Sequence, residues 1–95
     1  MAQVRENLTE LEGAIARREP DPLRPGYERV TLEVSRTAPV EDKPDLVHAA
    51  PGDTVPVSIR SDLLADVDVG SQVRLRAART SSGDIMGQPH PPDPR

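Results

Sequence analysis

Residues 54–79 read TVPVSIRSDLLADVDVGSQVRLRAAR, and this stretch decides the fold class. Apolar and polar side chains alternate at its two ends, and they alternate again in a segment that begins at residue 30. The apolar positions of the three segments are Val55, Val57, Ile59, then Val73, Leu75, Ala77, and earlier Val30, Leu32, Val34. A period of two is typical of a strand that buries one face. The sequence therefore predicts a mainly β (α+β) protein.

The residues around these segments complete a small barrel. Ser61–Asp66 is typical of one helical turn with Ser61 as its N-cap, and Pro56 favours an edge position in its strand. Leu46–Val47 and Ile85–Met86 are candidates for two shorter strands. We expect a five-strand, antiparallel barrel or sandwich of the OB-like or SH3-like kind.

The ends of the chain are predicted to lie outside this barrel, which we expect to span residues 27–87. Val4, Leu8, Leu11 and Ile15 follow one another at steps of four, three and four, which predicts an amphipathic helix over residues 1–19. Residues 20–26 contain three prolines and form an expected stiff connector. Residues 88–95 are an expected disordered tail, and the loop Thr37–Asp53 is expected to be mobile.

Composition limits the classes of function. The chain has 95 residues, no cysteine, and Tyr27 as its single aromatic residue, so we expect one thin aliphatic core that association of subunits would help to stabilise. A formal net charge of −4 disfavours general affinity for nucleic acid. Arginine-dominated basic charge suggests a GC-rich bacterial genome. No signal peptide or membrane-length apolar run is present, so the expected location is the cytoplasm, without a membrane partner.

Four arginines form the clearest polar candidate site. Arg74 and Arg76 share one face of a predicted strand, and Arg60 and Arg79 lie close to them in the expected barrel. Arginine binds phosphate through two parallel hydrogen bonds, so these residues are a candidate anion or nucleic-acid patch. The alternative is that acidic residues pair with them across strands on a solvated face.

Candidates for metal binding and catalysis are weaker. His48, Met86 and His90 could supply a soft-metal site, but metal ligands normally lie closer together in sequence. Asp62, Asp66 and Asp68 do not have the spacing of a calcium loop. No nucleophile, base and orienting group can be assembled, so we expect no catalytic residue, no metal and no cofactor.

The stretch from Thr54 to Thr80 resembles small bacterial OB-like and SH3-like barrels, in which a turn ending in Val-Gly leads into a strand. It is also similar to the molybdate-binding Mop (TOBE) domain, where a Ser is followed nine and twelve positions later by Gly and Val, as Ser61, Gly70 and Val73 are here. Ala65, Arg76 and Ala77 depart from that pattern, so no binding residue follows from the resemblance.

Three hypotheses for function follow. The first is a non-enzymatic interaction or assembly module that associates with itself or with a protein partner. Its expected contact surface is the helix stripe Val4, Leu8, Leu11 and Ile15, or an exposed edge strand. The second is an OB-like module that binds single-stranded nucleic acid through the arginine patch. The third is a barrel that binds a small ligand or oxyanion.

Overall fold

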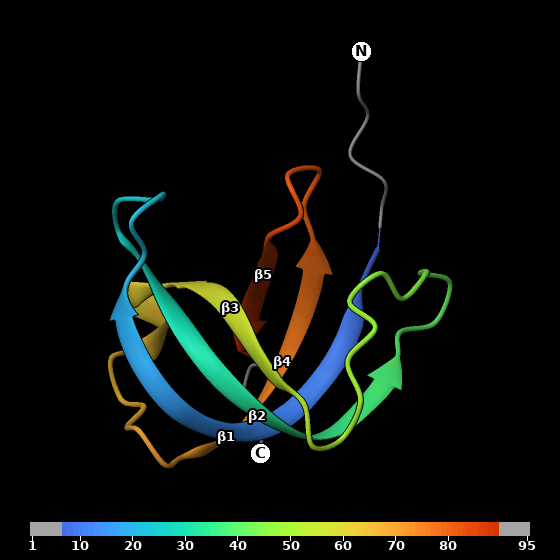
Figure 1. Ribbon diagram of the computed structural model, residues 1–95, viewed down its shortest axis with the longest axis horizontal. Helices are drawn as coiled ribbons and strands as arrows, with labels where there is room; N and C mark the ends of the chain where they lie inside the picture. The colour runs from blue at the N-terminus through green and yellow to red at the C-terminus, as the bar shows by residue number, and fades with distance from the viewer. Residues whose placement is uncertain (1–6, 90–95) are drawn as a thin grey trace, which may run out of the picture.

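The alternating segments are strands in the computed structural model, which describes residues 7–89 (Figure 1). In chain order the strands are β1 (Thr9–Pro20), β2 (Tyr27–Pro39), β3 (Thr54–Arg60), β4 (Gln72–Arg79) and β5 (Ile85–Pro89). The 3-10 turn η1 (Ser61–Leu64) lies between β3 and β4. The prediction of a mainly β, five-strand protein is confirmed. Because the sheet closes on itself, the architecture is a barrel and not a sandwich.

The strands follow one another around the barrel in the order β1-β2-β3-β5-β4. β1 pairs with both β2 and β4, and in Figure 1 β1 and β2 run side by side as two long bent ribbons. Every junction is antiparallel except that of β3 and β5, which are parallel and share the single bridge Ser58↔Met86. We call this junction the seam. Pro56 pairs with Thr31 of β2 and lies outside that bridge, but β3 is not the expected edge strand, because it lies between β2 and β5 in a closed barrel.

The predicted N-terminal helix is wrong, because residues 9–20 form the strand β1. Within this strand Thr9, Leu11, Gly13 and Ile15 are buried and the residues between them are partly exposed, so the true period is two. β1 contains register shifts at Glu12/Gly13 and Ile15/Arg17, which bend it around the barrel. The barrel therefore includes residues that were expected to lie outside it.

The core consists of aliphatic side chains from all five strands, from η1 and from the loop between β2 and β3. Its buried members are Leu11, Ile15, Val30, Leu32, Val34, Val47, Ala49, Val57, Ile59, Leu64, Leu75, Ala77 and Ile85. Among the described residues no aromatic side chain belongs to this cluster, as the composition predicts. Tyr27, the single aromatic residue, is half-buried outside this cluster.

Several smaller predictions need correction. Thr37 to Pro39 belong to β2, and Gln88 and Pro89 belong to β5 and not to a tail. Leu46–Val47 is not a strand, although Val47 is buried in the core. The turn at Ser61–Leu64 is confirmed, but its N-cap position is Arg60 and no side chain caps it.

Candidate functional site: a hollow beside the seam

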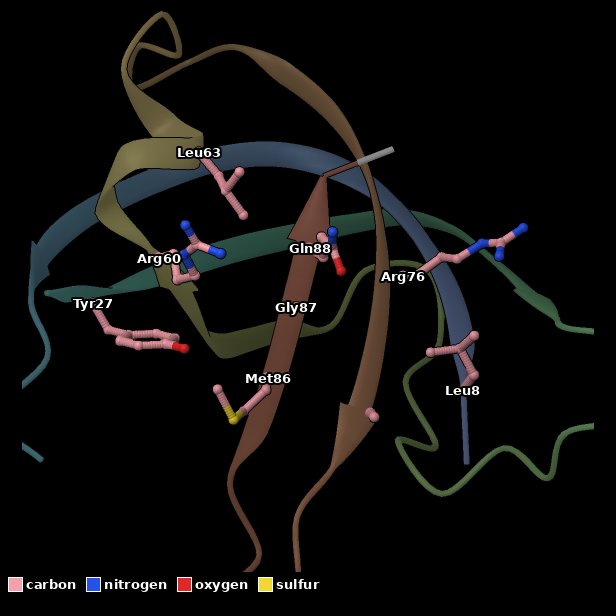
Figure 2. Close-up of a pocket in the computed structure, with 9 residues that line it drawn as sticks. Leu8, Tyr27, Arg60, Leu63, Arg76, Met86, Gly87 and Gln88 are labelled. Carbon is pink, nitrogen blue, oxygen red and sulfur yellow. The ribbon is translucent and has the colours of Figure 1, made fainter. Parts of the chain in front are cut away.

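A hollow of about 280 Å³ opens on the outer face of the barrel beside the seam (Figure 2). Four strands, η1 and Leu8, which directly precedes β1, form its lining, which consists of Leu8, Tyr27, Arg60, Leu63, Arg76, Ala78, Met86, Gly87 and Gln88. We call this site the seam hollow. It combines the chain's only aromatic ring with two arginines and several apolar side chains.

The middle of the seam hollow is formed by β5, where Gly87 decides which way its neighbours point. A Cβ atom on Gly87 would lie 2.6 Å from a methyl group of the core residue Val57, so this position faces the barrel interior. Because side chains alternate along a strand, Met86 and Gln88 point outward into the hollow. The small residue at 87 thus lets β5 lie close to the core while its two neighbours form the floor of the site.

Arg60 and Tyr27 occupy one end of the hollow and are paired in register between β3 and β2. Asp62 accepts hydrogen bonds from Nε and Nη2 of Arg60, at 3.1 and 2.5 Å. These bonds raise the pKa of the Arg60 guanidinium, which therefore remains charged. In Figure 2 Arg60, Tyr27 and Leu63 lie on one side of β5, whereas Arg76 and Leu8 lie on the other side.

The structure divides the predicted arginine patch among different places. Arg60 and Arg76 line the seam hollow, whereas Arg74 lines a smaller neighbouring hollow of about 170 Å³ and donates to Glu12 at 2.9 Å. The guanidinium of Arg79 donates to the carbonyl oxygens of Leu46 (2.7 Å), Gly83 (2.7 Å) and Val47 (3.2 Å). Arg79 therefore ties the loop after β2 to the turn between β4 and β5.

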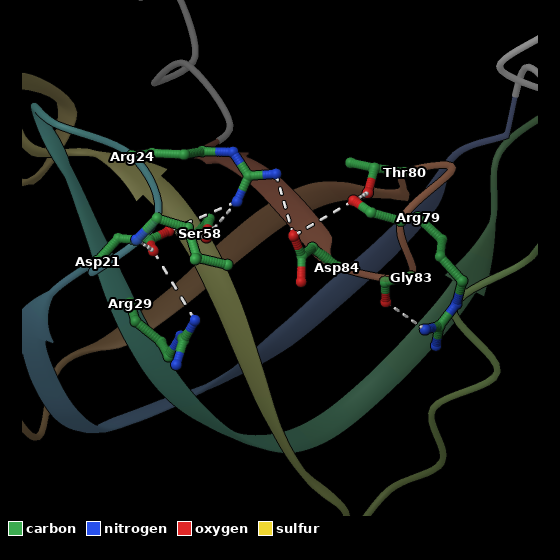
Figure 3. A network of polar contacts seen from close by, with 10 residues as sticks. Asp21, Arg24, Arg29, Ser58, Arg79, Thr80, Gly83 and Asp84 are labelled. Carbon is green, nitrogen blue, oxygen red and sulfur yellow. Dashed lines mark hydrogen bonds and ion pairs between the residues drawn. The ribbon is translucent and has the colours of Figure 1, made fainter.

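A second hollow, of about 340 Å³, lies at the other end of the seam. Two of its lining residues, Ser58 and Asp84, belong to a group of polar side chains that we call the loop latch, namely Asp21, Arg24, Ser58 and Asp84 (Figure 3). Arg24, in the loop between β1 and β2, donates to Asp84 at 3.1 Å and to Ser58 at 3.5 Å, and Ser58 donates to Asp21. The latch joins the β1–β2 loop to β3 and to the β4–β5 turn.

The carboxylate of Asp21 is fully buried in the loop latch. Its pKa is lowered by the hydrogen bond from Ser58 and by the backbone N–H of Leu23, at 2.9 Å, and further by the charges of Arg29 and Arg24. Both oxygens are occupied by partners from the protein itself. The latch is therefore satisfied internally and has a structural role.

The histidine and aspartate candidates do not come together as metal sites. Asp62 pairs with Arg60, as described above, and His48 is an exposed loop residue with φ 57°. His90 lies outside the described residues. Within residues 7–89 no group of three or more metal-ligating side chains is found.

The predicted helix stripe does not form a surface. Leu11 and Ile15 have 0% and 1% of their surfaces exposed, because both face the barrel interior. Leu8 lines the seam hollow, and Val4 lies outside the described residues. Sequence reasoning did not place Tyr27, Leu63, Met86 and Gln88 in a common site, since only the closure of the barrel brings β2, η1 and β5 together. The one signal in the sequence was the presence of a single aromatic residue.

The comparisons give no relative for this chain: no protein-family model, curated protein or solved structure matches it. In the part that the structure describes, no helix has both the length and the apolar character needed to cross a bilayer. Proposals about function therefore depend on the geometry of the barrel and its surface.

Proposed function

We propose that this protein is a non-enzymatic, protein-binding module built on a barrel of the OB kind, and that the seam hollow is its contact surface. The strand order, the parallel contact of β3 with β5 and the single bridge at the seam agree with the partly open, five-stranded OB barrel. Because OB barrels serve many functions, the proposal for function depends on the hollow and not on the fold.

The observation that carries the proposal is the chemistry of the hollow. Tyrosine, arginine and methionine are enriched at protein interfaces, and the hollow combines Tyr27, Arg60, Arg76 and Met86 in one concave surface. Tyr27 and Met86 are half-buried, so a partner can still cover much of their apolar surface. Among the nine lining residues no histidine, carboxylate or thiol is available for acid–base or nucleophilic chemistry, which favours binding over catalysis.

The second hollow is a weaker candidate, although OB barrels commonly bind ligands between the β1–β2 and β4–β5 loops. In this protein Arg24 is bound to Asp84 and Ser58, and Arg79 donates to three backbone carbonyl groups. A ligand there would compete with contacts that hold the loops together. In the seam hollow, by contrast, Arg60 donates to the exposed side chain of Asp62 and not to the backbone of a loop.

Site-specific photo-crosslinking tests the proposal. A photoreactive side chain at Gln88, in the floor of the hollow, should form an adduct with another protein in extract of the source organism. The same group at the exposed Glu33, which is not part of the hollow lining, should not form this adduct. Met86→Glu in the Gln88-labelled chain should abolish it, because the new charge replaces apolar contact surface. Equal adducts from both positions, or none from Gln88, would contradict the proposal.

Single-stranded nucleic acid is the second candidate ligand, favoured by the position of Tyr27 opposite Arg60 in the same hollow. A base could stack on the tyrosine ring while arginine binds phosphate. The test is fluorescence anisotropy of a labelled oligothymidine at several salt concentrations. Binding that weakens steeply with salt and is lost in Arg76→Gln would support this candidate. Absence of binding at low salt would exclude it.

A further inference from the structure

The register of the strands places three polar residues of the seam hollow in one row. Gln88 of β5 is directly opposite Arg76 of β4. Arg60 and Gln88 each lie two residues beyond the single bridge Ser58↔Met86, and Figure 2 shows Arg60 on the opposite side of Gln88 from Arg76. The row Arg60, Gln88, Arg76 thus crosses three strands. With strands about 4.8 Å apart, the two arginine backbones are separated by about 10 Å.

A second row, which is apolar, runs beside the first. Met86 is opposite Ala78, and Leu8, which directly precedes β1, follows next because Thr9 is opposite Ala77. Leu63 and Tyr27 extend the apolar surface at the β3 end of the hollow. A ligand that matches both rows carries charge at two points and apolar groups alongside them.

The sign of that charge follows from the lining. The hollow is lined by two arginines and by no carboxylate, although the whole chain has a formal net charge of −4. Asp62, bound to Arg60, and Glu10, opposite Arg76 on β1, lie at the two margins. An exposed ion pair such as that of Arg60 with Asp62 contributes little to stability, so a ligand carboxylate can share or replace it.

The same charges indicate which kind of ligand the seam hollow can bind. A continuous polyanion would have to pass Glu10 and Asp62 at the margins, whereas a peptide with two carboxylates need only reach the arginines. A second copy of the chain is disfavoured because a symmetric dimer through this surface would oppose four arginines from two linings without a carboxylate. A different, acidic protein segment fits these constraints.

We propose that the seam hollow binds an extended segment of a partner protein with two acidic residues about three positions apart and apolar residues between them. In the extended polyproline II conformation a chain has three residues per turn and rises about 3.1 Å per residue, so side chains three positions apart share one face. They span about 9 Å, which matches the roughly 10 Å between the backbones of Arg60 and Arg76. The carboxylates contact these arginines, and the intervening side chains lie against Met86 and Leu63. This inference rests on the proposed function and specifies the chemistry of its partner.

Tyrosine fluorescence can report this binding directly, because Tyr27 is the only tyrosine in a chain without tryptophan. The probe is a capped synthetic peptide with the core Glu-Leu-Val-Glu and no aromatic residue. Matched peptides carry Gln-Leu-Val-Gln or Lys-Leu-Val-Lys. We expect the acidic peptide to change the fluorescence with an affinity at least tenfold higher than that of either control peptide.

Two variants on the same face of β4 locate the effect. Arg76→Gln should weaken binding of the acidic peptide at least fivefold, whereas Arg74→Gln, outside the hollow lining, should leave it within twofold. Both side chains are exposed, and circular dichroism of each variant checks that the barrel is intact. Equal effects of the two substitutions would overturn the inference.

The controls also separate this inference from the function on which it rests. Equal binding of the acidic and glutamine peptides would refute an acidic partner but leave a protein-binding hollow. No response to any peptide at millimolar concentration would overturn the inference, and the crosslinking from Gln88 would still decide the proposed function. Saturable binding of oligothymidine without peptide binding would overturn both.

Discussion

At Gly13 the backbone of β1 lies close to the backbone of its neighbour β2. A Cβ atom at this position would lie 2.2 Å from the carbonyl oxygen of Glu33, a backbone atom that cannot rotate away. The register shift between Glu12 and Gly13 occurs at the same point. The bend of β1 therefore requires glycine at position 13, because there is no room for a side chain. Gly83, by contrast, has open space around it, and glycine is favoured there by the backbone angle φ of +95° in a turn.

Gly13→Ala should destabilise the barrel more than Gly83→Ala. The first substitution forces two backbones apart, and overpacking of this kind costs about 1–3 kcal/mol or more. The second places alanine in the left-handed region, at a cost of about 1–2 kcal/mol, without a steric contact. Urea denaturation of both variants measures the free energy of unfolding. A Gly13→Ala protein as stable as the wild type would show that β1 does not approach β2 so closely.

Asp21 links the stability of the barrel to pH. Its hydrogen bonds from Ser58 and Leu23 lower the pKa of the folded carboxyl below its ordinary value. A lowered pKa means that the folded state binds the proton less readily than the unfolded chain does. The stabilisation is therefore complete above the unfolded pKa, near pH 4, and is lost as the pH falls through the folded value.

Asp21→Asn should lower the free energy of unfolding at pH 7 by about 1–3 kcal/mol, because the buried latch loses its charged acceptor. The difference from the wild type should shrink as the pH falls below about 4, where the unfolded wild-type carboxyl takes up a proton, and the folded carboxyl becomes neutral only at a lower pH. Denaturation at pH 7 and pH 3 measures both values. The control is Asp66→Asn at an exposed position, expected to change stability by about 0.5 kcal/mol or less. A constant difference at the two pH values would contradict the role of the Asp21 charge.

At the level of elements, the sequence predicts strands well where apolar residues alternate without interruption. β2, β3 and β4 each contain an uninterrupted apolar alternation, and the segment Ile85–Met86 is indeed part of β5. β1 is the exception, because two of its inward positions are Thr9 and Gly13. These residues conceal the period of two, and Leu8, which lies on the outer face, completes an apparent helical stripe with Leu11 and Ile15.

The candidate site was predictable only in part, for a related reason. Arg60 and Arg76 belong to alternating strands, so their outward direction follows from the pattern. Their proximity depends on β5 lying between β3 and β4, which is a matter of strand order. Arg74 and Arg76 share a strand face in sequence, yet Glu12 of β1 binds Arg74. Pairing partners on neighbouring strands thus divide a patch that the sequence presents as continuous.

Arg18 attaches η1 and the following loop to the strands. Its guanidinium makes a two-point ion pair with Glu28, at 2.8 Å for each contact, and its Nη1 donates to the carbonyl oxygens of Leu64 and Val67. The Arg18 hydrogen bonds lower the pKa of Glu28, so the pair is charged at neutral pH. Arg17, by contrast, is 71% exposed in its side chain.

Arg18→Gln should therefore loosen residues 64–71 and lower the free energy of unfolding by about 1–3 kcal/mol, since Glu28 and two carbonyl groups lose a charged donor. Arg17→Gln should change stability by about 0.5 kcal/mol or less. Amide hydrogen exchange detects the loosening at Val67 and Gly70, whose N–H groups donate to Leu64 and Ile15. Unchanged protection of both amides in Arg18→Gln would argue against the attachment.

Across the whole molecule, the long loop after β2 is more firmly attached than its composition suggests. Val47 and Ala49 are buried, Leu8 donates a backbone hydrogen bond to Pro44 at 3.1 Å, and Asp45 accepts a hydrogen bond from Thr9 at 2.6 Å. Burial raises the pKa of Asp45, but the hydrogen bonds it accepts outweigh burial and the net change is downward. The sequence could not reveal this attachment, because it depends on β1 being a strand beside the loop.

The most general consequence of the fold concerns β1, which pairs with β2 on one side and β4 on the other. A chain beginning at Pro20 lacks this strand, and the buried side chains of Leu11 and Ile15 with it, so it should not form a stable barrel. We expect poor dispersion in its proton–nitrogen NMR spectrum and no cooperative thermal transition.

Adding a synthetic peptide of residues 7–20 should restore the native spectrum, since the missing strand can pair again, whereas the same peptide with Leu11→Asp and Ile15→Asp should not. A chain from Pro20 with a native-like spectrum on its own would show that β1 is dispensable and that residues 27–87 fold as the sequence pattern first predicted.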